Sequence, residues 1–151
     1  MKAVVQRVSQ ASVKIPSENY SAKIEKGLLI LLGIKTGDTE NDVNFVADKC
    51  CNLRIFEDEN NKMNISVHEI NGEVLIISQF TLYGETAKGN RPSFIEAAKP
   101  EEAIPLYNKF IGRMKINLGQ EKIKCGIFGA IMDVSLINTG PVTVQVESKN
   151  N

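Results

Sequence analysis

Polar and aromatic residues end an apolar run at Ser78–Leu82, whose sequence is Ser-Gln-Phe-Thr-Leu. On a strand, Ser78 and Phe80 would share one face and Gln79 and Thr81 the other, because side chains alternate. The Thr81 hydroxyl could serve as a nucleophile, but an unactivated hydroxyl is weak and no base lies near it in the sequence. These residue types also fit a strand that simply runs into solvent.

A second unusual segment, Asn138–Thr143, contains Gly140 followed by Pro141. Glycine permits backbone conformations closed to other residues, and the bond before proline has a cis form that costs only ~0.5–1 kcal/mol. Local chemistry leaves two interpretations open: a simple turn between two strands, or a backbone group shaped for binding.

The familiar catalytic constellations are missing from the sequence. A Ser-His-Asp or Cys-His arrangement needs a histidine base, and the single histidine, His68, falls in an expected hairpin strand. Gly126–Gly129 lacks the third glycine of a dinucleotide site, and the acidic run Glu57–Glu59 is typical of a solvated turn. The three cysteines fit neither a disulfide framework nor a zinc site. We therefore expect no metal and no cofactor.

The strands that must hold these segments follow from hydrophobic periodicity. Extended segments are expected at 4–15 and 28–34. The pair Asn71-Gly72 predicts a hairpin between strands 63–70 and 73–81. Two last strands, 131–137 and 142–147, are expected to be joined by a turn at 138–141.

Two helices complete the expected elements. A capping-box-like start at Thr39 begins an amphipathic helix, and a second helix runs from about Glu101 to Asn117, with Gly119 as its cap and Pro105 in its first turn. Two helices cannot cover both faces of so much sheet. We therefore expect sheet packed on sheet, with the helices on one side.

Composition predicts one ordinary globular domain over residues 1–151, without linker or repeat. The formal net charge is zero, so a contact with nucleic acid should be small and local, such as a chain terminus, rather than a long duplex. Gln6 and Arg7 interrupt the apolar start, and no apolar run is long enough for a bilayer. We expect a soluble, cytoplasmic protein that binds neither membrane nor DNA.

Taken together, the two unusual segments resemble the paired motifs of the D-aminoacyl-tRNA deacylase family. The resemblance continues in Lys88–Phe94, in Phe128–Met132 and in the opening residues Met1–Val8, so it spans nearly the whole chain with the motifs in the family's order. Five coincident segments are very specific, whereas any one of them would be weak. The sequence departs from the family pattern at Thr139, a position where an acidic residue is expected as often as not. No catalytic role depends on this residue.

The resemblance implies an α/β fold, a three-layer β/β/α sandwich with rolled, barrel-like sheets and two main helices. It implies a hydrolase that cuts the carboxylic ester between a D-amino acid and the terminal adenosine of tRNA, as a proofreading step of translation quality control. Glycyl-tRNA mischarged on tRNA(Ala) would be a second substrate. It also implies a cytoplasmic homodimer in which the Gly-Pro motif crosses into the partner's site.

For mechanism, the resemblance implies that Ser78, Gln79, Phe80 and Thr81 form the catalytic segment. Amide groups around Phe80 and Thr81 would stabilise the oxyanion, and the ribose 2′-hydroxyl of the substrate would assist the attack. This division of labour fits the absence of a base beside the Thr81 hydroxyl.

Chiral selection is implied for Gly140 and Pro141. Their bond is cis in the family, and two carbonyl oxygens side by side would hold the α-ammonium group of the substrate by charge-assisted hydrogen bonds. The side chain of a D-amino acid would then point to open space, while that of an L-amino acid would collide with the motif backbone. Glycine has no side chain to collide and should pass.

The remaining implied roles concern the nucleoside and the supports of the site. The adenosine pocket would be formed by Gln79, Phe80 and Phe128, the supporting residues would be Arg7, Met132 and Asn138, and Lys88 and Arg91 could contact tRNA phosphates. Stacking of an unpaired base on an aromatic ring suits RNA ends.

Two rival classes stay open on the sequence alone. A non-catalytic RNA-end or nucleotide-binding module would share the aromatic surface without needing acceptors for an ammonium group. A small-molecule hydrolase or chaperone-like trimer of similar size has no motif in its favour. Hydrolysis of D-tyrosyl-tRNA but not L-tyrosyl-tRNA would separate the deacylase from both.

Overall fold

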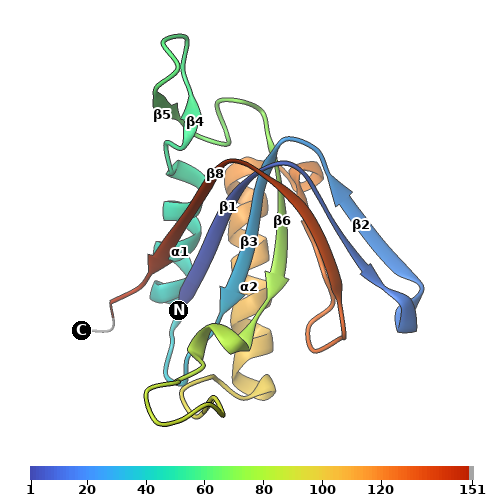
Figure 1. Cartoon of the computed structure of the whole chain (residues 1–151), viewed down its shortest axis with the longest axis vertical. Helices are drawn as coiled ribbons and strands as arrows, with labels where there is room; N and C mark the ends of the chain where they lie inside the picture. Colours follow the sequence, from blue (N-terminus) through green and yellow to red (C-terminus); the bar gives the residue numbers. More distant parts are fainter. Residues whose placement is uncertain (150–151) are drawn as a thin grey trace.

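The computed structural model describes residues 1–149 and contains a curled six-stranded sheet backed by two helices, together with a small two-stranded sheet of β4 (Phe56–Glu57) and β5 (Met63–Ile65) (Figure 1). The six-stranded sheet contains β1 (Lys2–Ile15), β2 (Tyr20–Ile24), β3 (Gly27–Gly33), β6 (Glu73–Ser78), β7 (Ile123–Cys125) and β8 (Asp133–Glu147). Its order is β2-β1-β3-β6-β7, and β8 pairs with the other edge of β1. The helices are α1 (Glu40–Asn52) and α2 (Pro100–Leu118). Mixed α/β architecture with a nearly closed, barrel-like sheet confirms the expected fold class.

Two hydrophobic cores lie on opposite faces of this sheet. One packs the sheet against α1 and α2 and includes Leu28, Ile30 and Phe110. The other is enclosed by the curl of the sheet and includes Val13, Leu29 and other apolar side chains. The β3 strand supplies both cores, because alternate side chains of a strand point to opposite faces. Its run Leu28–Leu32 is nearly continuous and apolar for that reason.

The helix boundaries agree with the expected capping chemistry. At the start of α1, Thr39 and Asp42 form a capping box, and the Thr39 amide donates to the Asp42 carboxylate at 2.7 Å. The α2 helix ends before Gly119, whose φ of 102° suits glycine. Pro105 was expected in the first turn, but α2 begins at Pro100, so Pro105 lies in the second turn. It is exposed there, where water can satisfy the carbonyl that loses its partner.

The expected hairpin at Asn71-Gly72 is wrong. The chain does turn there, with Asn71 at φ 53°, but β5 (Met63–Ile65) pairs with β4 (Phe56–Glu57), while β6 runs parallel to β3 and β7. The reason is burial: Val74–Ile77 is buried on both faces, which is the pattern of a central parallel strand. His68 consequently lies in an exposed turn instead of a hairpin strand.

The two last strands are a single one. β8 pairs antiparallel with β1 from Asp133 to Glu147, and the expected turn at 138–141 is a bulge within it. Between the Gln6–Thr143 and Val8–Asn138 pairs, β1 advances by two residues and β8 by five. The bulge lies where the strand pair passes from the helix-side core to the curled core.

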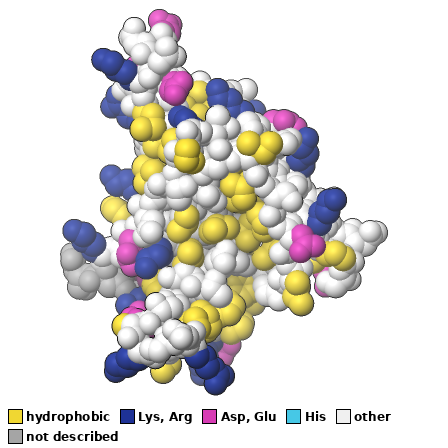
Figure 2. All heavy atoms as spheres, in the orientation of Figure 1, with side chains coloured by type: hydrophobic (Ala, Val, Ile, Leu, Met, Phe, Trp, Pro, Cys, Tyr) yellow, Lys and Arg dark blue, Asp and Glu magenta, His cyan; other side chains and the backbone are white. Residues whose placement is uncertain are grey.

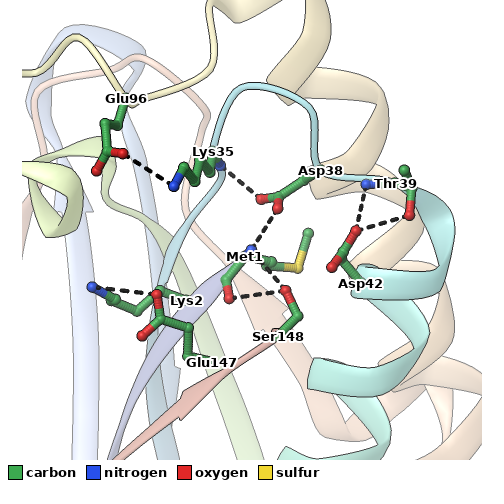
Figure 3. A network of polar contacts seen from close by, with 9 residues as sticks. All are labelled: Met1, Lys2, Lys35, Asp38, Thr39, Asp42, Glu96, Glu147 and Ser148. Atoms are coloured by element: carbon green, nitrogen blue, oxygen red, sulfur yellow. Dashed lines mark hydrogen bonds and ion pairs between the residues drawn. The ribbon is translucent and has the colours of Figure 1, made fainter. Parts of the chain in front are cut away.

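A polar network fixes the start of β1 beside the end of β8 (Figure 3). The α-ammonium group of Met1 donates to the Asp38 carboxylate at 2.6 Å and to the Ser148 hydroxyl at 2.9 Å. Both members of the ion pair are fully buried, and the Lys35 amide donates to the second Asp38 oxygen at 2.7 Å. Among residues 1–149, no helix is long and apolar enough to cross a membrane.

Candidate active site

The first motif does not continue as a strand beyond Ser78. The Gln79 amide donates to the Leu32 carbonyl at 2.8 Å, and Phe80–Tyr83 then forms one turn of 3-10 helix. The expectation that Ser78–Leu82 alternates between two faces is therefore wrong after Ser78. The turn begins with the amides of Phe80 and Thr81, which have no acceptor within a helix that starts there. No described residue outside the turn accepts from them.

The turn forms one wall of a cavity of about 170 Å³. Opposite walls come from the loop that follows β7 and from the start of α2. The lining includes Ser78, Gln79, Phe80, Phe128, Met132 and Ala103. The structure thus brings together the residues expected for an adenosine pocket, Gln79, Phe80 and Phe128, although they lie far apart in the sequence.

Aromatic contacts set the shape of this cavity. Phe80 meets Phe94 edge to face, with ring centroids 5.1 Å apart, and Phe128 meets Tyr107 in the same way at 5.6 Å. Such pairs hold rings in defined orientations. Phe80 nevertheless stays 56% exposed, so one of its sides is free for a ligand.

No acid or base lines the cavity among the described residues. The Thr81 hydroxyl accepts a hydrogen bond from the Gln79 side-chain amide at 2.8 Å, and an amide cannot take up its proton. His68 lines a separate hollow together with Asp48 and Arg113. Proton transfer by a side chain of this cavity therefore has no evident agent.

The cysteines lie elsewhere and are not reactive thiolates. Cys50 and Cys51 are buried in α1, and Cys51 contacts the Met114 sulfur at 3.4 Å. Burial raises the pKa of Cys51 to about 11, so its thiol stays protonated at neutral pH. Within residues 1–149, no three His, Cys, Asp or Glu side chains gather as a metal-binding group.

The second motif is a bulge whose backbone is held by hydrogen bonds from the side chains of Arg7 and Asn138. The Gly140-Pro141 bond is cis, as expected, and both residues are exposed. The Arg7 guanidinium donates from Nε to the Thr139 carbonyl and from Nη1 to the Ile55 carbonyl, each at 2.8 Å. Arg7 thus connects the bulge to the segment before β4 by two hydrogen bonds.

Asn138 closes the base of the bulge. Its side-chain oxygen accepts from the Val142 amide at 2.8 Å, and its side-chain amide donates to the Thr143 hydroxyl at 3.0 Å. Gly140 has a φ of 139°, and a β-carbon there would lie 2.9 Å from Arg7 Nη2 and 2.8 Å from Val142 Cγ2. Only glycine fits this position without displacement.

The two motifs lie at opposite ends of β3 within one chain (Figure 1). Arg7, which holds the bulge, pairs with Leu28, whereas Ser78 pairs with Leu32. Four residues of strand separate them by about 13 Å. Met132, expected to support the bulge, lies at the cavity end, against Gly126. The residues of the bulge are accordingly absent from the lining of the cavity in the same chain.

Some residues of the site have no signal in the sequence. The Ile55 carbonyl, which anchors Arg7, is a backbone atom that no residue type announces. Ala98 and Ala103 line the cavity because small side chains leave room there. Tyr107 of α2 is buried against Phe128 and belongs to no motif of the sequence.

An apolar surface extends across the face of the molecule that carries β8. Ile131 and Ile137 are 87% and 51% exposed, and β8 has buried residues only near its end. In the orientation of Figure 1, apolar side chains gather over the middle of this face, with charged ones around them (Figure 2). Exposed apolar patches of this kind mark interaction surfaces.

Comparisons with known proteins agree on one family. The sequence model of the family described as D-Tyr-tRNA(Tyr) deacylase matches residues 4–147. The chain is 59% identical to the D-aminoacyl-tRNA deacylase of Flavobacterium psychrophilum and 59% identical to that of Cytophaga hutchinsonii, in each case over 99% of both chains.

Solved structures show the same fold. A structure titled c-Myc DNA Unwinding Element Binding Protein has a TM-score of 0.93 and 42% identity, covering 99% of this chain and 100% of that one. A probable eukaryotic D-amino acid tRNA deacylase has a TM-score of 0.86 over 97% of this chain and 98% of that one. At 15% identity, the latter bears on the fold alone.

Proposed function

Because the chain belongs to the D-Tyr-tRNA(Tyr) deacylase family and is a hydrolase of D-aminoacyl-tRNA, we propose that it acts as a chiral proofreading enzyme in the cytoplasm. It frees D-amino acids, and glycine mischarged on tRNA(Ala), from the 3′ end of tRNA, and it rejects L-aminoacyl esters. The observation that carries this proposal is the division of the site into a cavity without a base and an exposed backbone bulge.

The terminal adenosine occupies the cavity in this proposal. Phe80 and Phe128 offer ring surfaces, and the Gln79 side chain offers a donor and an acceptor for the base or ribose. Recognition of one unpaired nucleotide needs few cations, which agrees with a net charge of zero. Lys88 and Arg91, exposed in the loop after the turn, contact the nearest phosphates.

The carbonyl oxygens of Gly140 and Pro141 hold the α-ammonium group of the substrate. No side chain of residues 1–149 donates a hydrogen bond to either oxygen, and both residues are exposed. Hydrogen bonds to a charged partner contribute about 1.5–3 kcal/mol each. With the ammonium group and the ester both fixed, an L side chain meets the bulge backbone. A steric clash with the L side chain discriminates strongly between L and D esters, and it does not depend on the identity of the D side chain.

The bulge completes the cavity of a second copy. The separation of about 13 Å along β3 leaves the two motifs of one chain apart, while the exposed apolar face around β8 offers a surface for a homodimer. Two-fold symmetry would place each bulge at the partner's cavity and create two equivalent sites. Met132, at the cavity, would then support the partner's bulge.

Attack on the ester uses water with the help of the ribose 2′-hydroxyl. The described lining of the cavity supplies no base, so the substrate itself provides the group that orients or activates the nucleophile. The Phe80 and Thr81 amides stabilise the negative charge on the ester oxygen, an effect worth about 2.7–4 kcal/mol per donor in other acyl-transfer enzymes.

The test compares three esters with the same enzyme preparation. D-tyrosyl-tRNA and glycyl-tRNA(Ala) should lose their amino acid, and L-tyrosyl-tRNA should stay intact. A D-tyrosyl-tRNA that ends in 2′-deoxyadenosine, with the ester on the 3′-oxygen, should bind and resist hydrolysis. Equal hydrolysis of D and L esters would overturn the chiral mechanism, and rapid hydrolysis of the deoxy substrate would overturn the role of the 2′-hydroxyl.

A further inference from the structure

The Phe128 ring, one wall of the cavity, rests on a second aromatic ring outside the cavity. Tyr107 of α2 meets it edge to face, with centroids 5.6 Å apart. Tyr107 is 3% exposed and is absent from the cavity lining. Its hydroxyl donates to the Ile76 carbonyl of β6 at 3.2 Å. The tyrosine ring is thus fixed at one end by the helix and at the other by the sheet.

The same carbonyl also holds the loop that carries Phe128. The Gly126 amide donates to the Ile76 oxygen at 3.1 Å. The carbonyl of that same peptide unit, belonging to Cys125, accepts from the Tyr20 hydroxyl of β2 at 2.7 Å. Both polar groups of the peptide unit are therefore hydrogen-bonded, the amide to β6 and the carbonyl to the Tyr20 side chain of β2. The stem of the Gly126–Met132 loop is fixed before it reaches the cavity.

Packing inside this loop leaves little room for adjustment. A β-carbon on Gly126 would lie 2.4 Å from the Met132 sulfur, so Met132 covers the glycine closely. Phe128 and Met132 both line the cavity, and Tyr107 contacts the Phe128 ring from outside the lining. Among residues 1–149, Tyr107 makes the one aromatic contact to Phe128, which also packs against the helix-side core. The edge-to-face contact with Tyr107 therefore contributes to the orientation of the Phe128 ring.

We propose that Tyr107 is a positioning residue for nucleoside binding: it sets the Phe128 ring at the angle that stacks on the terminal adenine. The inference rests on the proposed function, since that function assigns adenine to Phe128. Tyr107 touches no substrate and acts through the ring contact, while its hydroxyl bond to Ile76 keeps its own ring in place. This links the middle of the α2 helix to substrate affinity.

Binding of adenosine 5′-monophosphate, measured by calorimetry, isolates this role from catalysis. Tyr107→Leu removes the ring contact and should weaken binding by about three- to tenfold, the range of a lost aromatic pair. Tyr107→Phe keeps the ring and loses only the bond to Ile76, so a smaller loss of about two- to fivefold is expected. Phe110→Leu, on the same helix and fully buried but outside the cavity, is the matched control and should bind normally.

A double-substitution cycle decides whether Tyr107 acts through Phe128. In a Phe128→Ala background, Tyr107→Leu should have no further effect on nucleotide affinity. With D-tyrosyl-tRNA, the single Tyr107 variants should raise KM and leave kcat unchanged, because stacking is present in ground and transition states alike. Thermal unfolding checks each variant, and Tyr107→Phe keeps the core filled should Tyr107→Leu fail to fold.

Equal weakening by Tyr107→Leu in both backgrounds would overturn the inference, as would the same loss in Phe110→Leu. Failure of the proposed function is a separate result: the unmodified enzyme would leave D-tyrosyl-tRNA intact. Hydrolysis by the unmodified enzyme together with additive effects in the cycle would remove Tyr107's role and leave the deacylase assignment standing.

Discussion

The two halves of the site are built in opposite ways. The cavity is assembled from four separate parts of one chain, β3, β6, α2 and the loop after β7, and its walls are packed side chains. The bulge at Thr139–Pro141 is exposed, and among residues 1–149 the side chains that hold its backbone by hydrogen bonds are those of Arg7 and Asn138. The cavity is thus enclosed by packed side chains, whereas the bulge is a backbone segment exposed at the surface.

Because of this difference, we expect the affinity for the nucleoside and the preference for D over L esters to depend on different residues. Changes in the cavity should alter how tightly the nucleoside binds, with little effect on the preference for D over L esters. In the proposed mechanism, changes in the bulge should alter that preference, because the bulge would supply the atoms with which an L side chain collides. Each substitution below therefore has two readouts, KM and the ratio of D to L hydrolysis.

The largest effect is expected for Gly140→Ala. The new methyl group would lie under 3 Å from Arg7 Nη2 and Val142 Cγ2, at a φ that disfavours any side chain. The carbonyl oxygens of Gly140 and Pro141, which are proposed to hold the ammonium group, must therefore move. Displacement by about 1 Å costs on the order of 100-fold in kcat/KM. The loss is measured as kcat/KM for hydrolysis of D-tyrosyl-tRNA. The control is Gly112→Ala in α2, where the new methyl group would have nothing within 4 Å.

Thr81→Ala provides the contrast on the cavity side. It removes one hydrogen bond with Gln79 and should cost only about two- to fivefold. Complete loss of activity in folded Thr81→Ala would identify the hydroxyl as the nucleophile and contradict the substrate-assisted mechanism.

Arg7→Lys should produce an intermediate effect of about tenfold in kcat/KM. A guanidinium spans the Thr139 and Ile55 carbonyls at once, whereas an ammonium is a single point and cannot replace a fork. Because the bulge loosens, the ratio of D to L hydrolysis should fall as well. Lys14→Ala, exposed on the same strand, should change neither quantity. An unchanged ratio in Arg7→Lys would mean that the bulge does not select.

Phe80→Ala should raise KM for D-tyrosyl-tRNA by about fivefold, the lower end of what base stacking contributes, since the ring is half exposed. The ratio of D to L hydrolysis should stay constant. A changed ratio with constant KM would reverse the roles assigned to the two halves.

The smallest effect on activity is expected at Asp48, remote from both halves. Hydrogen bonds from Arg113 hold the pKa of this carboxyl below the ordinary 3.8. A lowered folded-state pKa adds stability above pH 3.8 that disappears as the pH falls through the folded-state pKa. Asp48→Asn should lower Tm at neutral pH, lose that deficit in acid, and leave activity unchanged. A pH-independent deficit would show that charge plays no part.

Much of the fold could be predicted from local chemistry. The capping box at Thr39 located the start of α1, and both ends of α2 were predicted to within one residue, because these signals depend on a few neighbouring atoms. The prediction of a hairpin at Asn71-Gly72 was wrong because a turn motif indicates where the chain reverses direction but not which strand the following segment pairs with. The double burial of Val74–Ile77 decides that pairing.

The site was harder to predict because its residues act through backbone. The identities of Gln79, Phe80 and Phe128 were recognisable as motif residues, and they do share a cavity. The 3-10 turn after Gln79, the bulge in a continuous β8 and the Ile55 carbonyl have no residue pattern of their own. They arise from the register of strands that are distant in sequence.

Subunit complementation tests the central claim most directly, that the bulge of one copy completes the cavity of another. One preparation carries Gly140→Ala in the bulge and a second carries Phe80→Ala with Phe128→Ala in the cavity, and the two are mixed under conditions that exchange subunits. Random exchange makes half of the dimers mixed, and each mixed dimer has one intact site of two, so kcat/KM for D-tyrosyl-tRNA should return to roughly a quarter of the unmodified value. Mixtures no more active than their separate components, despite proven exchange, would contradict the account.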